Sequence, residues 1–81
     1  MNIQFNYHGA TYKAGLEKRG DNTLEVEIKD NALKEQFGKS LPFFVENQSV
    51  GFNMLNKGHS DLYALNSSIS KAIAEQYKEL L

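Results

Sequence analysis

Three consecutive residues, His59-Ser60-Asp61, carry the imidazole, hydroxyl and carboxylate of a hydrolase triad. A working triad needs these groups to converge from separated positions, because neighbours in the chain cannot pass a hydrogen bond from one to the next in the required order. Ser60 and Asp61 also suit the start of a helix, where their oxygens accept from free backbone amides and a negative charge is favoured by the helix dipole. We therefore predict a helix start here and no catalytic group.

Two further patterns could hold a phosphate or a metal ion. Gly38-Lys39-Ser40 resembles the end of a phosphate-binding loop, but Leu33 stands where that motif requires its first glycine. Gly38 is instead typical of a helix end. His8 and His59 are far apart in the chain, and the sequence contains neither an H-x-x-x-H spacing nor a cysteine. We expect no cofactor and no metal.

Composition and charge limit the partners. The chain has 81 residues, which is one domain spanning 1–81, and nine basic against ten acidic residues leave a net charge of -1. Nucleic-acid binding usually needs a concentrated basic surface, so we expect none. A weak alternative is the binding of single-stranded nucleic acid on the outer face of the sheet. Four basic residues could contact the phosphates there: Lys13, Lys18, Arg19 and Lys29. Glu17, Glu25 and Glu27 share this face and would repel the phosphates.

The same composition bears on the compartment. No run of eighteen apolar residues exists, and the N-terminal segment alternates polar with apolar residues instead of forming a leader. With no cysteine available for disulfides, we expect a cytoplasmic protein that does not contact a membrane.

The C-terminal segment from Ser60 to Leu81 has the clearest helical period. Its apolar residues recur three and four positions apart and share one arc of a helical wheel: Leu62, Leu65, Ile69, Ala72, Ile73, Tyr77 and Leu80. Such a helix needs an apolar surface to cover. The N-terminal third provides one, since alternation there predicts strands with a single apolar face.

The first two strands can be paired from the turn between them. His8-Gly9 fits a two-residue hairpin loop, and closing the chain there sets Tyr7 opposite Ala10, Phe5 opposite Tyr12 and Ile3 opposite Ala14. All six then share the apolar face.

A third strand through Leu24, Val26 and Ile28 is expected to follow the turn at residues 19–22. We expect Leu16 to face Leu24, which would put Lys13 opposite Glu27 on the outer face.

The second half of the chain completes the predicted fold. Asp30 or Asn31 can cap a short helix near 31–37, and Leu41, Phe43 and Val45 indicate a fourth strand that Pro42 places at an edge or at a strand start. A fifth short strand through Val50, Phe52 and Met54 is a further expectation. The fold class is α+β: an antiparallel sheet, formed by a three-stranded meander plus one or two further strands, packed on one face by a long C-terminal helix.

Three aromatic residues form the candidate partner-binding site: Phe43, Phe44 and Phe52. Adjacent residues on a strand point to opposite faces, so Phe43 and Phe44 cannot both enter one core. Either the short helix near 31–37 covers Phe44, or Phe44 contacts a partner. We expect a small binding domain without catalytic activity that contacts a protein partner or a second copy of the chain.

An alternative function is ligand binding or catalysis in a pocket between the last helix and the sheet. Its lining would be two tyrosines and two amide side chains: Tyr12, Tyr63, Asn66 and Gln76. The two amides project toward the flanks of the helix's apolar stripe, where each needs a hydrogen-bond partner.

Overall fold

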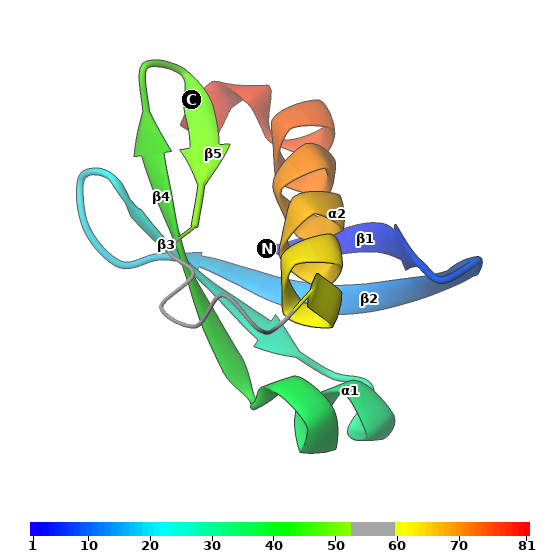
Figure 1. Ribbon diagram of the computed structural model, residues 1–81. Helices are drawn as coiled ribbons and strands as arrows, with labels where there is room; N and C mark the ends of the chain where they lie inside the picture. Colours follow the sequence, from blue (N-terminus) through cyan, green and yellow to red (C-terminus); the bar gives the residue numbers. More distant parts are fainter. Residues whose placement is uncertain (53–59) are drawn as a thin grey trace.

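The computed structural model describes residues 1–52 and 60–81 and consists of one antiparallel sheet covered by helices on one face (Figure 1). The five strands are hydrogen-bonded in the order in which they occur in the chain. They are β1 (Asn2–Tyr7), β2 (Ala10–Lys18), β3 (Thr23–Ile28), β4 (Ser40–Glu46) and β5 (Ser49–Gly51). The helices are α1 (Asn31–Phe37) and α2 (Ser60–Gln76), followed by the 3-10 turn η1 (Lys78–Leu80). The predicted α+β fold is confirmed.

Helix α2 packs against β1 and β5 and closes the core as the sequence predicts. Leu65, Ile69 and Ile73 on α2 are completely buried. The sheet contributes every second residue of its strands to the same core: Ile3, Phe5, Tyr7, Ala14, Leu16, Leu24, Val26, Ile28, Leu41 and Phe43. The two-residue period of the strands and the 3.6-residue period of the helix thus meet in one apolar layer.

The last helix ends earlier than predicted. It stops at Gln76, and Tyr77 leaves helical geometry with φ -132° and ψ 56° before η1 begins. The apolar period continues to Leu80, but Tyr77 and Leu80 pack against the core from outside the helix. The periodic pattern therefore identified the apolar side chains that contact the core, although Leu62, Tyr77 and Leu80 are only partly buried, and it placed the helix boundary incorrectly.

The first hairpin has the predicted register, and the second does not. Tyr7 pairs with Ala10, and Phe5 pairs with Tyr12. Across β2 and β3, however, Leu16 faces Val26 instead of Leu24. The predicted register is wrong by two residues. Glu27 consequently lies opposite Gly15, and the expected pairing with Lys13 is absent.

Helix α1 and strand β4 follow the prediction with one correction. The side chain of Asp30 accepts a hydrogen bond from the backbone N–H of Leu33 at 3.1 Å and caps α1. Strand β4 begins at Ser40, two residues before Pro42, and it is not an edge strand as a whole, because it lies between β3 and β5. Pro42 is nevertheless tolerated, since β5 pairs only with residues 44–46 and leaves the first half of β4 uncovered. The fifth strand is shorter than expected, because β5 ends at Gly51 and Phe52 lies outside it. The expected continuation to Met54 lies outside the described residues.

Candidate functional site

The predicted aromatic group is divided between the two faces of the sheet. Phe43 is completely buried, whereas the next residue, Phe44, is 36% exposed on the outer face. Phe52 lies on the core side, where its ring centroid is 6.1 Å from that of Phe43 and 5.5 Å from that of Tyr63. Tyr63 is 58% exposed, so an aromatic row leads from the core to the surface. Phe44 is separate from this row.

Helix α1 does not cover Phe44. Leu33 of α1 is buried in the core, and the ring of Phe37 contacts the core residue Tyr7 edge to face at 6.0 Å. Helix α1 and the tip of the β4–β5 hairpin lie at opposite ends of β4 (Figure 1). Phe44 faces Thr23 on β3 and Gly51 on β5, and Gly51 has no side chain with which to cover the ring.

The strand pair β4–β5 borders an open hollow of about 870 Å³, to which Phe44 contributes. We call its apolar part the β4–β5 surface, defined by Phe44, Val45, Val50, Gly51 and Phe52. The turn that joins the strands has positive φ at both of its residues, 52° for Asn47 and 63° for Gln48. Such geometry matches the twist of a two-residue hairpin but is unfavourable for a glutamine.

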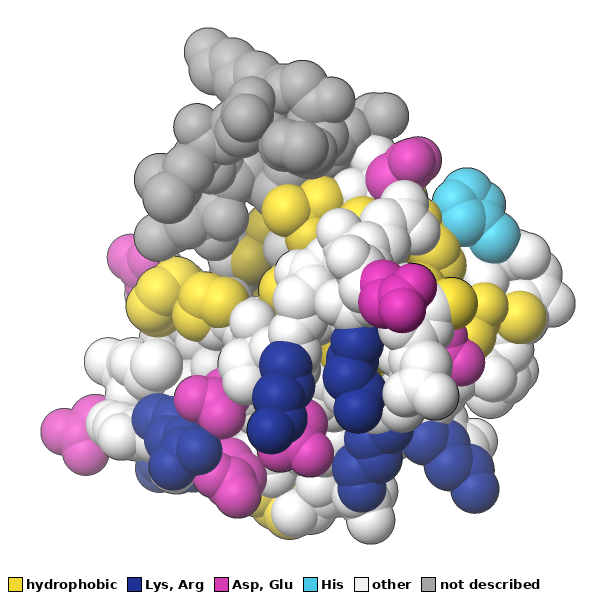
Figure 2. All heavy atoms as spheres, turned by 90° about the horizontal axis from the view of Figure 1, so that it is seen from below, with side chains coloured by type: hydrophobic (Ala, Val, Ile, Leu, Met, Phe, Trp, Pro, Cys, Tyr) yellow, Lys and Arg dark blue, Asp and Glu magenta, His cyan; other side chains and the backbone are white. Residues whose placement is uncertain are grey.

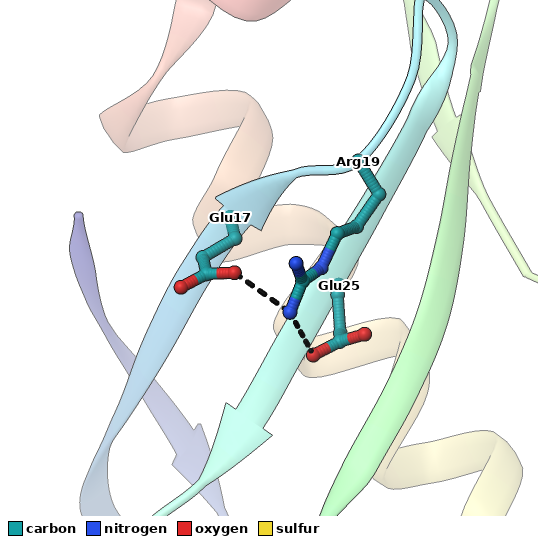
Figure 3. Close-up of polar contacts among 3 residues, drawn as sticks. All are labelled: Glu17, Arg19 and Glu25. Atoms are coloured by element: carbon teal, nitrogen blue, oxygen red, sulfur yellow. Dashed lines mark hydrogen bonds and ion pairs between the residues drawn. The ribbon is translucent and has the colours of Figure 1, made fainter.

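A three-residue ion-pair cluster occupies the outer face between β2 and β3 (Figure 3). The register places Glu17 directly opposite Glu25, an arrangement that is repulsive by itself. Arg19 lies between them, with its Nη2 at 2.8 Å from a Glu17 oxygen and 3.0 Å from a Glu25 oxygen. The hydrogen bond to Glu25 and the charges of both carboxylates raise the pKa of the Arg19 guanidinium. Arg19 thus offsets the repulsion between the two glutamates, and because the three side chains are 34–62% exposed, the ion pairs add little to the stability of the hairpin.

The four residues of the predicted ligand pocket are not brought together. Tyr12 stacks on Phe5 with ring centroids 5.8 Å apart, at the first hairpin. Tyr63 and Gln76 are thirteen residues apart on one helix, a distance of about 20 Å. Asn66 lies between them, 4% exposed, and its Oδ1 has no hydrogen-bond partner among the described residues. They cannot line one small pocket.

Gln76 has a different role, which it shares with Tyr77. Its side-chain amide accepts from the backbone N–H of Gln4 at 3.1 Å and donates to the backbone C=O of Gln4 at 2.7 Å. The hydroxyl of Tyr77 makes the same pair of bonds with the backbone of Asn2. These side chains occupy the outer edge of β1 as a neighbouring strand would. The Gln76 amide needs a hydrogen-bond partner at the flank of the apolar stripe, but that partner lies 72 positions away in the sequence and no local pattern identifies it.

The charges on the surface are mixed. Figure 2 shows basic side chains gathered in the lower half of that view, with acidic side chains among them and at their borders. On the outer face, Glu17, Glu25 and Glu27 lie between the Lys13 end of the hairpin and Arg19. A continuous basic track for a nucleic-acid strand is therefore missing from the described surface.

Residues 1–52 and 60–81 contain no helix that is long and apolar enough to span a membrane. The same residues contain no group of three or more histidine or acidic side chains placed to hold a metal ion. Comparison with protein families, curated proteins and solved structures gave no match to this chain.

Proposed function

We propose that this chain is a cytoplasmic binding domain without catalytic activity of its own, and that it binds an extended segment of a partner protein on the β4–β5 surface. The observation that carries the proposal is the position of Phe44. It is a large apolar side chain, 36% exposed on an otherwise polar face, beside a hollow and next to the last strand of the sheet.

The two edges of the sheet differ in a way that favours β5 as the binding edge. At β1, the side chains of Gln76 and Tyr77 already bond to the outward backbone groups of Gln4 and Asn2. At β5, a two-residue turn makes Glu46 and Ser49 a hydrogen-bonded pair, so the backbone N–H and C=O of Val50 point away from β4. A partner strand can pair with these groups.

The size of this edge favours a flexible peptide over a second folded copy. Three residues of strand offer about 10 Å of edge. Stable interfaces between folded proteins bury about 1,200–2,000 Å² in total, more than so short an edge and one phenyl ring provide. An extended peptide gains backbone hydrogen bonds at Val50, and its alternating side chains can contact Phe44 on one face and Phe52 on the other.

A peptide-display selection on the immobilised wild-type protein tests this proposal. We expect selected peptides to carry apolar residues at alternating positions and to bind Phe44→Ser at least tenfold more weakly, while Lys71→Ala, a change on the exposed side of α2, binds them normally. The backbone amide of Val50 should shift in NMR titrations. Methylating the peptide nitrogen that pairs with Val50 should abolish binding.

Three results would overturn the proposal. Peptides that bind wild type and Phe44→Ser equally would remove Phe44 from the site. Failure to select any peptide that distinguishes the two proteins would have the same consequence. A wild-type dimer in light scattering that Phe44→Ser converts to a monomer would show that a second copy occupies the surface.

A further inference from the structure

Two lysines on the outer face lie opposite each other without a counter-ion. Ala14 pairs with Ile28, so the preceding residue on β2, Lys13, and the residue after β3, Lys29, come next to each other on the outer face. Like charges in this arrangement repel. All ion pairs in the described part of the chain involve Arg19, so neither lysine has a carboxylate within 4 Å.

These lysines border a hollow at the β1 end of the outer face. Its volume is about 340 Å³, and its lining consists of Asn2, Ile3, Gln4, Lys13, Lys29 and Gln76. The lining therefore combines two cations with three amide side chains, and no acidic residue of the described chain contributes to it. Gln76 is held in place by its two hydrogen bonds to the backbone of Gln4, which fixes one wall of the hollow.

Gly15 leaves room for one of the lysines. A Cβ atom at this position would lie 3.7 Å from Cε of Lys29, which shows that the lysine stem passes over the glycine. The stem is thus directed across β2 instead of away from the sheet. Gly15 has no side chain to displace the ammonium group from the neighbourhood of the hollow.

We propose that this hollow binds a doubly charged oxyanion of the phosphate type. Each lysine neutralises one of its charges, and the side-chain N–H groups of the amides, apart from the one that Gln76 donates to the backbone of Gln4, are available to the oxygens. Binding such an anion converts the repulsion between Lys13 and Lys29 into two attractive contacts. This site lies on β1 and β2, where Gln4 pairs with Lys13, whereas Phe44 lies on β4. The anion site is therefore independent of the peptide proposed at β5.

NMR titration with inorganic phosphate, at an ionic strength kept constant with chloride, tests the site. We expect saturable shifts of the backbone amides of Lys13 and Lys29 and of the Gln76 side-chain amide. Lys13→Met and Lys29→Met should each weaken binding at least tenfold. Lys18→Met is the matched control, because it removes the same charge from the same strand about 17 Å from Lys13.

Two further measurements extend this test. Lys13→Arg should restore the phosphate binding that Lys13→Met weakens. A small phosphate monoester should shift the same backbone amides if the hollow accepts an organic group beside the phosphoryl oxygens. The proposal is overturned if chloride alone produces the same shifts, or if Lys18→Met weakens phosphate binding as much as Lys13→Met does. Either result would identify general screening of the protein's charge as the cause.

Discussion

At the scale of single residues, Tyr7 shows how burial controls ionisation. Its side chain is buried in the core, and its hydroxyl donates to the backbone oxygen of Asp61 at 3.5 Å. Burial, followed by the charges of Asp61 and Tyr12, raises the pKa of the Tyr7 phenol above its usual value of 10.0. The folded state therefore holds this proton more tightly than the unfolded state, in which the phenol is exposed to water.

This raised pKa predicts a loss of stability in alkali. The contribution of the protonated Tyr7 phenol to the free energy of unfolding is fully present below the unfolded pKa of about 10, and it is lost as the pH rises through the folded pKa. Denaturant midpoints measured between about pH 8 and pH 11 should fall for the wild type. Tyr7→Phe should show a shallower fall, whereas Tyr63→Phe, at a 58% exposed position, should follow the wild type. Parallel pH curves for Tyr7→Phe and wild type would contradict the assignment.

The faces of individual side chains could be predicted from the sequence wherever a strand is regular. The alternation of β4 assigns Phe43 and Phe44 to opposite faces, and the structure confirms this. Hydrogen-bond partners could not be predicted in the same way. Gln76 and Gln4 are 72 positions apart, and only the assembled fold brings them together. The periodic pattern likewise does not reveal that Asn66 is buried with an unpartnered Oδ1.

At the scale of elements, the two hairpins explain which registers a sequence determines. A slip of one residue moves every side chain to the wrong face, so parity excludes it. A slip of two residues keeps all faces, and only the loop can exclude it. His8-Gly9 fixes the first loop at two residues, but residues 19–22 allow more than one closure. The backbone N–H of Arg19 bonds to the C=O of Thr23, and this tighter closure extends β2 to Lys18.

The end of α2 supplies a prediction about the edge of β1. Gln76→Ala removes both hydrogen bonds to the backbone of Gln4, which at an exposed position should cost about 0.5–1.5 kcal/mol of unfolding free energy. Hydrogen exchange of the Gln4 amide should accelerate in this variant, because that N–H loses its acceptor. Glu75→Ala, at the neighbouring exposed position, is the control. Unchanged exchange at Gln4 would show that the contact does not protect the edge.

At the scale of the whole molecule, one helix organises both proposed sites. Helix α2 packs on β1 and β5, the two edges of the sheet, and its buried residues form the centre of the core. Its last residue, Gln76, walls the hollow near Lys13 and Lys29, and Tyr63 in its first turns lies against Phe52. Both candidate sites therefore depend on how α2 packs against the sheet, although each lies at a different edge of the sheet.

The packing of α2 against the sheet can be tested with two substitutions on the helix. Ile69 is completely buried, so Ile69→Ala removes apolar contacts and leaves a cavity between α2 and the sheet. We expect a loss of about 2–5 kcal/mol in unfolding free energy, a large share of the total for a domain of this size. Lys71→Ala, two positions away on the exposed side, should change the urea midpoint little. Equal losses in the two variants would mean that α2 buries a different face, and both proposed sites would then lose their structural support.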